Sequence, residues 1–188
     1  MNTFKRFQKL FSGPYEWFLI QEAKKGDREA FGKLYAYYLD PLFRFVFFRV
    51  SKQKETAEDI VSDVFVKAWT KLDTFKKGNF RAWLYMIARR TVIDFYRSSS
   101  KIHTGLEESV IDEKINVEES VLLSLSTQEA IAGIKKLTSE QQEVLVLKFV
   151  EDMGNKEIAK ILGKKEDAIR ALQHRGLTEL RKILENEK

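Results

Sequence analysis

Three side chains rich in hydrogen-bond donors stand close together near the C-terminus, at Arg170, His174 and Arg175. On a helix these positions fall on one outward face. Guanidinium and imidazole groups there can donate to base edges in the major groove of DNA. The chemistry that these residues offer is therefore recognition of a nucleic acid.

The segment from Asn155 to Leu172 has the pattern of two short helices joined by a tight turn, which would hold that face outward. Ala159 is small where the helices must cross, and Gly163 permits a positive φ that a residue with a Cβ resists. Any packed helical hairpin that ends in glycine can share this pattern, but the outward basic residues favour a DNA-reading helix-turn-helix. The apolar positions of the two helices are Ile158, Ala159, Leu162, Ile169 and Leu172.

A second stretch, from Asn79 to Arg97, interleaves basic and aromatic residues. Cations that hold phosphates, next to rings that stack on bases, suit single-stranded or opened DNA. The commoner alternative is a solvated helix face with snorkelling arginines. Of these two interpretations we favour contact with single-stranded or opened DNA. The expected core stripe is Phe80, Leu84, Ile87, Ala88 and Thr91, flanked by Arg81, Tyr85, Arg89, Arg90, Tyr96 and Arg97.

Three carboxylates, Glu55, Asp59 and Asp63, recur at every fourth position of a third predicted helix. Like charges at this spacing oppose helix formation by roughly 0.2 to 0.5 kcal/mol per pair. Acidic residues near a helix N-terminus suit the helix dipole, which explains Glu55 and Asp59 better than Asp63. The alternative is a docking face for a basic protein partner. A metal or general-acid site is a poor third choice because histidines and a second acidic cluster are missing.

The composition narrows the class of protein. Helical spacing recurs throughout the 188 residues and no alternating strand pattern occurs, so we expect an all-α protein. The absence of Cys excludes disulfides and thiolate metal sites, and two histidines make a zinc or histidine-based catalytic cluster improbable. We find neither a secretory signal nor a membrane-spanning run, and expect a soluble, cytoplasmic protein without a cofactor.

Charge is distributed unevenly along the chain. Residues 1–101 hold 20 Lys and Arg against 11 Asp and Glu, a balance of +9, whereas residues 102–127 hold one Lys against six acids, a balance of −5. The remaining residues hold 12 against 11, a balance of +1. The basic parts suit a polyanion, and the acidic strip should lie away from DNA.

Helix signals divide the chain into two lobes. Asp27 and Asn79 are predicted caps, Pro41 should begin or bend a helix, and Thr138 to Gln141 should form a capping box. The expected helices run from Asp27 to Tyr38, Leu42 to Val50, Glu55 to Leu72, Asn79 to Arg97 and Thr138 to Phe149, followed by the helix-turn-helix. Two small helical domains joined by a flexible acidic linker are the predicted architecture. Its predicted parts are an N-terminal extension at 1–24, a first domain at 25–98, a linker at 99–116 and a second domain at 117–188.

Several stretches together resemble the bacterial RNA polymerase sigma factors of the sigma-70 family, in the small extracytoplasmic-function group. The resemblance extends over about residues 25 to 185 in the family's order and spacing. The stretches that carry it are Phe31 to Tyr35, Ala57 to Trp69, Asn79 to Arg89 with Ile93 and Asp94, Gln142 to Leu145, Glu157 to Gly163 and Arg170 to Arg175.

The resemblance implies a subunit that binds core RNA polymerase, recognises the minus-10 and minus-35 promoter elements and helps to open the duplex, without catalysis of its own. Its implied partners are core polymerase, promoter DNA and an anti-sigma factor, with the membrane involved only indirectly if that factor is membrane-bound. The implied polymerase contacts are Asp59, Asp63, Phe65 and Trp69. The implied minus-10 contacts are Lys76, Lys77, Asn79, Arg81, Trp83, Arg89, Arg90 and Arg97. The implied minus-35 contacts are Lys164, Lys165, Arg170, Ala171, His174 and Arg175.

Some positions depart from the family's pattern. Arg90 stands where Asn is frequent, and Ser62 where Gln or Glu is usual. Lys165 replaces a frequent capping Ser before the second helix of the helix-turn-helix, the reading helix, which should therefore start poorly capped, with Lys165 directed to a phosphate instead. Gly154 similarly replaces a usual Ser. Core packing is at least as good an explanation for Trp83 as DNA contact. Residues 1–20 lie outside the resemblance, and their phenylalanines and lysines could form a basic amphipathic helix.

Two other classes of protein compete with this interpretation. A helix-turn-helix regulator acting on DNA alone would leave the acidic face and the first lobe's basic and aromatic helix unexplained. A helical nuclease would need metal ligands, or a nucleophile with a base, and the sequence offers no candidates. The sigma factor interpretation accounts for all three faces.

Overall fold

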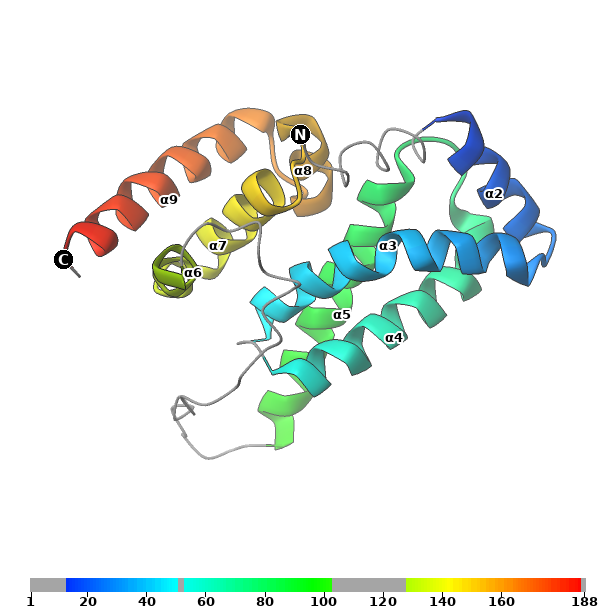
Figure 1. Ribbon diagram of the computed structural model, residues 1–188, viewed down its shortest axis with the longest axis horizontal. Helices are drawn as coiled ribbons and strands as arrows, with labels where there is room; N and C mark the ends of the chain where they lie inside the picture. The colour runs from blue at the N-terminus through cyan, green and yellow to red at the C-terminus, as the bar shows by residue number, and fades with distance from the viewer. Residues whose placement is uncertain (1–12, 51–52, 103–127, 187–188) are drawn as a thin grey trace. The chain divides into compact units, whose positions relative to one another are not determined.

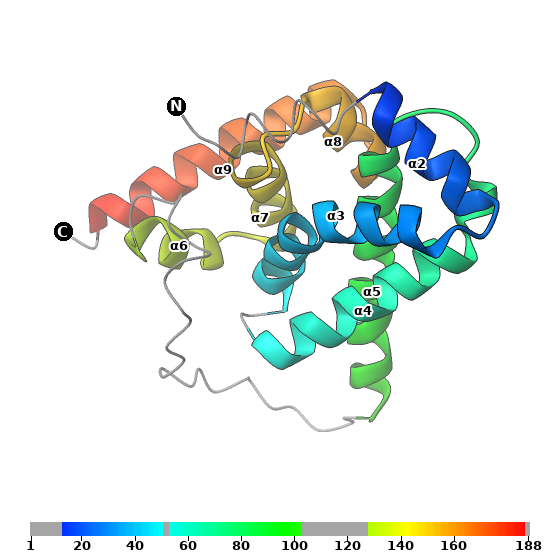
Figure 2. The same cartoon turned by 45° about the vertical axis from the view of Figure 1, so that its right-hand side comes forward.

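The computed structural model describes residues 13–50, 53–102 and 128–186, and every regular element within these ranges is a helix (Figure 1, Figure 2). The predicted all-α class is therefore confirmed. The backbone divides into two compact units with the boundary inside α5, between Thr91 and Val92. The predicted acidic linker, apart from its first four residues, and the amphipathic segment of residues 1–12 lie outside the described ranges.

The first unit is built from four α-helices and one short 3-10 helix. Its elements are α2 (Pro14–Lys24), α3 (Arg28–Arg49), α4 (Lys54–Thr70), η1 (Leu72–Thr74) and the part of α5 (Phe80–Ile102) that precedes the boundary. The helix α2 packs against α3 and reaches η1, and α3 packs against α4 (Figure 1). Ring contacts from Tyr38 to Phe80, at 5.6 Å between centroids, and from Phe45 to Tyr85, at 5.1 Å, join α3 to α5. These contacts form one apolar core.

The helix α2 is an element that was not predicted from the sequence. Leu19, Ile20 and Ala23 bury one side of it, Pro14 begins it, and Lys25 and Gly26 follow its end. Proline in the first turn and glycine just past the last are ordinary helix boundaries. This signal was readable in residues 14–26, most of which belong to the predicted N-terminal extension, residues 1–24.

The helix α3 starts and continues as its residues dictate. The Asp27 carboxylate accepts hydrogen bonds from the backbone N–H groups of Glu29, at 2.8 Å, and Ala30, at 3.1 Å, which confirms the predicted cap. Pro41 lies inside α3 and is buried, so the two helices expected on either side of it are one element. Pro41 cannot donate a backbone hydrogen bond, and its burial in the core stabilises the helix at this position.

The second unit contains α6 (Gln128–Lys135), α7 (Ser139–Leu145), the π-helical turn η2 (Val146–Val150), α8 (Asn155–Leu162) and α9 (Glu166–Asn186). The capping box predicted at Thr138 and Gln141 is present. The long helix α9 packs against α6, α7 and α8. Two glycines allow α9 to approach α6 and α7 closely. A Cβ at Gly133 of α6 would lie 2.7 Å from Leu180 Cδ1, and one at Gly176 of α9 would lie 3.2 Å from Leu145 Cδ1.

The end of α5 differs from the sequence expectation. The helix predicted from Asn79 was expected to end at Arg97, but α5 continues through Ser98, Ser99 and Ser100 to Ile102. Serine is an indifferent helix former rather than a helix breaker, and no glycine or proline stands there to stop the helix. The first residues assigned to the linker are thus helical, while the domain boundaries themselves stay predictions.

Candidate nucleic-acid interface

The two helices α8 and α9 form the predicted helix-turn-helix. Gly163 ends α8 in the left-handed region, with φ of 65°, and the N–H of Lys164 donates to the Ala159 carbonyl at 3.0 Å. Ile158 and Ile169 are fully buried where the two helices meet. The apolar and glycine positions identified from the sequence therefore occupy the expected places.

The outward face of α9 carries the residues predicted to read DNA. Arg170, Ala171, His174 and Arg175 are exposed, as is Lys165 just before the helix. Lys164 differs from them because its ammonium lies 2.9 Å from the Glu140 carboxylate and its side chain is about one third exposed. The predicted cations and donors of this face are thus in contact with solvent, except for Lys164, which is partly covered and paired.

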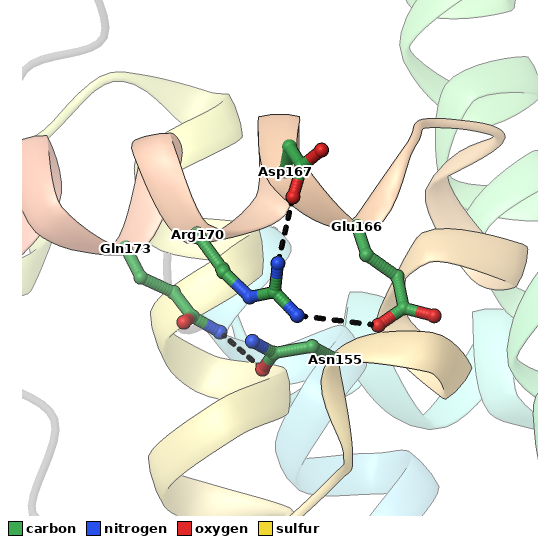
Figure 3. A network of polar contacts seen from close by, with 5 residues as sticks. All are labelled: Asn155, Glu166, Asp167, Arg170 and Gln173. Atoms are coloured by element: carbon green, nitrogen blue, oxygen red, sulfur yellow. Dashed lines mark hydrogen bonds and ion pairs between the residues drawn. The ribbon is translucent and has the colours of Figure 1, made fainter.

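Arg170 is held by two acidic neighbours on its own helix. Its guanidinium lies 2.6 Å from an Asp167 carboxylate oxygen and 3.7 Å from a Glu166 oxygen (Figure 3). These pairs are three and four residues apart, and all three side chains are well exposed, so each pair contributes little to stability. They do orient the guanidinium toward the N-terminal end of the reading helix.

A side-chain hydrogen bond joins the two helices of the motif. The Gln173 amide donates to the Asn155 side-chain oxygen at 3.0 Å, which links α9 to the first residue of α8 (Figure 3). Both residues are half-buried. Neither was identified from the sequence, because their pairing depends on how the helices cross.

The segment before α5 is a short loop with a fixed start and end. Phe75 is buried at its beginning, and the Asn79 side chain accepts a hydrogen bond from the Ala82 N–H at 2.9 Å at its end, which confirms the predicted cap. Gly78 has φ of 144°, a conformation that side chains with a Cβ rarely adopt. Lys76 and Lys77 are exposed on this loop.

Three aromatic rings from the two ends of the loop pack against one another. Trp83 is half-buried, with its ring centroid 5.4 Å from those of Phe75 and Phe80. Phe75 and Phe80 also meet edge to face at 5.4 Å. Trp83 is therefore part of the packing, which the sequence favoured at least as much as DNA contact, while part of its surface stays accessible.

The arginines of α5 lie in different surroundings. Arg81 is half-buried, with its guanidinium 5.8 Å from the centroid of the buried Tyr85 ring. Arg89 is also half-buried, whereas Arg90 and Arg97 are exposed. The arginines at the start and in the middle of α5 are thus partly covered by packing, and those farther along are open to solvent.

The phenol pKa values of two tyrosines of α3 are raised. Burial raises the pKa of the Tyr37 phenol overall, although the nearby Arg81 charge acts to lower it. The neighbouring Tyr38 donates to Glu16, and burial followed by the Glu16 charge raises the Tyr38 pKa well above its ordinary value. Both phenols therefore stay protonated, and Tyr38 serves as a hydrogen-bond donor to Glu16.

The acidic face of α4 is exposed at Glu55, Asp59 and Asp63. Neither Asp59 nor Asp63 forms an ion pair with another residue that the structure describes. Phe65 and Trp69 contact α3 instead. The Phe65 centroid lies 4.5 Å from that of Tyr35, and the Trp69 centroid lies 4.8 Å from that of Phe31. Phe65 is buried and Trp69 half-buried.

Two other features are absent from the described ranges. These residues contain no group of three or more His, Asp or Glu side chains able to hold a metal ion. No described helix has an apolar stretch of the length and hydropathy that crossing a membrane requires. The surfaces that remain are the outward face of α9, the loop with the start of α5, and the acidic face of α4.

Comparison with known families identifies these elements. Residues 34–102 match the family described as Sigma-70 region 2, and residues 127–180 match Sigma-70, region 4. The extracytoplasmic-function sigma factor SigX of Bacillus subtilis is 30% identical over 165 residues, a span of 84% of this chain and 84% of SigX. The chain belongs to the sigma-70 family of RNA polymerase sigma factors.

A second relative of the extracytoplasmic-function group and one solved structure are also similar to this chain. BldN of Streptomyces coelicolor is 36% identical over 171 residues, and the match spans 88% of this chain but only 64% of BldN. The solved structure of the sigma factor RpoE with the anti-sigma factor NepR, from Bartonella quintana, has the same fold, with a TM-score of 0.66 and 24% identity over 84% of this chain and 98% of that one.

The matched regions correspond to consecutive groups of helices. Region 2 spans most of α3, together with α4, η1 and α5, and region 4 spans α6 to α8 and most of α9. The helix α2 precedes the region 2 match. As a sigma factor, the protein directs promoter-specific initiation of transcription by RNA polymerase, and is a regulator of transcription.

Proposed function

We propose that three surfaces divide the work of this sigma factor: α4 binds core polymerase, the loop before α5 takes a base of the minus-10 element, and α9 reads the minus-35 element. The observation that carries most of this proposal is that all three surfaces are exposed on the described chain, although each helix buries its opposite side. Charged faces that stay open to solvent are candidates for contact with other molecules.

The polymerase contact is proposed for Asp59 and Asp63. Their carboxylates are exposed, without an ion pair among the described residues, and one helical turn apart. A basic partner surface would neutralise the repulsion between them. Phe65 and Trp69, which also belong to the proposed contact, pack on α3 and would hold the acidic face in position, with the accessible part of Trp69 at its edge.

The minus-10 contact is proposed for the loop and for α5 as far as Arg97. Lys76, Lys77, Arg90 and Arg97 are exposed cations that can hold phosphates, and Arg81 and Arg89 are half-buried cations beside them in sequence. Asn79 and Trp83 hold the loop by capping and by packing. A flipped base would be taken at this loop, because its backbone is held at both ends and Gly78 lacks a side chain that would fill the space.

The minus-35 contact is proposed for α9, where Arg170, His174 and Arg175 would face base edges and Ala171 would allow close approach. Lys165, at the start of the helix, would contact a phosphate. Lys164 is assigned to the same face, and its pairing with Glu140 would have to exchange for a phosphate.

The protein is proposed to lack catalysis of its own and to act in the cytoplasm, where the polymerase works. An anti-sigma factor is its proposed regulator. This chain shares the fold of the sigma factor RpoE, whose structure was solved in complex with the anti-sigma factor NepR, and that complex supports the proposal. The membrane would be involved only through such a partner, if that partner were membrane-bound.

Transcription reconstituted from core polymerase, this protein and genomic DNA tests the proposal. Sequencing of transcript starts should show one pair of spaced elements upstream of most starts, and omission of the protein should abolish them. Footprinting the same promoter with the isolated protein at physiological salt is the contrasting measurement. Protection of both elements without core would favour a stand-alone helix-turn-helix regulator and contradict the proposal.

A further inference from the structure

The loop from Lys76 to Asn79 depends on a residue in a helix that precedes the region 2 match. The last turn of α2 contains Lys24, whose ammonium donates a hydrogen bond to the backbone carbonyl of Phe75. The same ammonium lies 6.0 Å from the centroid of the Phe75 ring. Lys24 is half-buried, and α2 as a whole packs against η1, the 3-10 turn that leads into the loop.

Both the backbone and the ring of Phe75 make contacts that fix its position. Its N–H donates to the Leu72 carbonyl at 3.0 Å, its carbonyl accepts from Lys24, and its ring packs in the buried cluster with Phe80 and Trp83. A residue with both backbone polar groups bonded and its side chain buried has little freedom to rotate. The direction in which the chain leaves toward Lys76 is therefore set at Phe75.

Lys24 supplies the part of this arrangement that comes from outside the loop. A hydrogen bond from a charged donor is stronger than one between neutral groups, and an ammonium near an aromatic face adds attraction to the ring. The Asn79 cap fixes the other end of the loop. Only three residues lie between these anchors, and one of them, Gly78, adopts φ of 144°, which a residue with a Cβ rarely does.

We propose that Lys24 is a positioning residue for minus-10 recognition, which holds the loop in the shape that accepts the base. This inference rests on the proposed role of the loop. Without the Lys24 hydrogen bond the loop would sample several shapes, and the correct minus-10 base would lose its advantage over the others. Minus-35 recognition by α9 would not change.

Two variants of Lys24 separate its charge and its donor from its apolar stem. Lys24→Met keeps the stem over the Phe75 ring but removes the donor and the charge, while Lys24→Arg keeps both. Lys25→Met is the matched control, because Lys25 is the next residue, is exposed and pairs only locally, with Glu22 at 2.7 Å. Circular dichroism and thermal unfolding of each full-length variant establish that it is folded.

The first measurement, in the full-length protein, is hydrogen exchange of the backbone amides of Thr74 and Phe75, which donate to the Lys71 and Leu72 carbonyls where the chain enters the loop. Lys24→Met should speed their exchange by roughly tenfold, the effect expected from losing one charged hydrogen bond, whereas Lys24→Arg and Lys25→Met should match the parent. Unchanged exchange in Lys24→Met would overturn the inference.

The second measurement is promoter discrimination by the reconstituted holoenzyme. The ratio of transcription from the native promoter to that from a promoter with one substituted minus-10 base should fall by roughly tenfold for Lys24→Met and recover for Lys24→Arg. The corresponding ratio for a substituted minus-35 base should stay the same. Equal losses at both elements, or an equal loss in Lys25→Met, would assign Lys24 a purely structural role and overturn the inference.

Gly78→Ala distinguishes this inference from the proposed function of the loop. A Cβ at that φ distorts the loop directly. If Gly78→Ala leaves minus-10 discrimination intact, the loop does not read the element and the proposed function itself is wrong. If Gly78→Ala lowers discrimination and Lys24→Met does not, only the role of Lys24 is wrong.

Discussion

The guanidinium of Arg170 lies 2.6 Å from the carboxylate of Asp167, three residues before it on the reading helix α9. A residue proposed to donate to DNA bases is thus already donating to an acid of its own helix. For Arg170 to contact a base, this pair and the weaker one to Glu166 must break or share the guanidinium. In the proposed complex the two carboxylates would also repel DNA phosphates that approach them.

Asp167→Asn should therefore strengthen binding of the holoenzyme to promoters. The exposed pair is worth only about 0.3 to 0.5 kcal/mol, so its loss together with the lost repulsion should give a gain of about two- to fivefold. Titration of holoenzyme onto a fluorescent promoter fragment measures this gain. Glu179→Gln is the control, because Glu179 pairs with Lys182 in the same three-residue spacing farther along α9. A weakened Asp167→Asn complex would instead mean that the acid positions Arg170 productively.

The base-reading and phosphate-holding residues of the helix-turn-helix should respond differently to alanine. Arg170→Ala and Arg175→Ala should relax the preference for the minus-35 sequence, each by about 1 to 3 kcal/mol if the side chain bonds a guanine through both nitrogens. Lys165→Ala should lower affinity evenly across sequences and flatten the salt dependence. Competition between native and substituted promoters over a range of salt separates the two effects. A uniform loss in the arginine variants would contradict the distinction.

Reversing charge on the acidic face of α4 should weaken assembly with core polymerase. Asp59→Lys and Asp63→Lys should each reduce capture of the protein by core at least several-fold, because each places a cation against a basic partner surface. The fold should remain, since both side chains are exposed. Asp73→Lys, an equal charge change at an exposed position of η1, is the control in the same pull-down. If both α4 variants bind core as well as the parent, the docking assignment is wrong.

Asp152 is the one non-glycine residue in the described ranges with a positive φ, at 52°. It lies in the turn between η2 and α8, where the Met153 N–H donates to the Leu147 carbonyl at 3.0 Å. Asp152→Gly should raise the free energy of unfolding by about 0.5 to 1 kcal/mol, because glycine adopts this conformation without strain. Asp152→Val should lower it by about 1 kcal/mol or more, since a β-branched residue fits there poorly.

Chemical denaturation of the full-length protein measures both Asp152 variants. Lys160→Gly is the opposing control, because Lys160 lies exposed inside α8 and glycine there should cost about 1 kcal/mol. A loss of stability in Asp152→Gly as large as that of Lys160→Gly would show that the Asp152 side chain contributes more than its backbone strain removes.

Much of the fold was predictable from the sequence, since its signals are local. The caps at Asp27, Thr138 and Asn79 depend on hydrogen bonds to residues two or three positions away. The turn at Gly163 depends on the backbone of one residue, and the buried faces of α8 and α9 on helical spacing. These interactions join residues only a few positions apart along the chain. The helix-turn-helix and its outward basic face could therefore be identified from the amino-acid sequence alone.

The tertiary structure decided the features that join distant residues. Lys24 and Phe75 are 51 residues apart, and Asn155 and Gln173 are 18 apart, so no local pattern marks either pair. The continuation of α3 through Pro41 depends on burial against neighbouring helices rather than on helix propensity. The sequence alone determined which faces carry charge and which family the motifs resemble. Only packing decided that α2 completes the first core, that Arg170 starts out paired, and that the loop before α5 is anchored from another helix, because side chains far apart along the chain meet only once the helices cross.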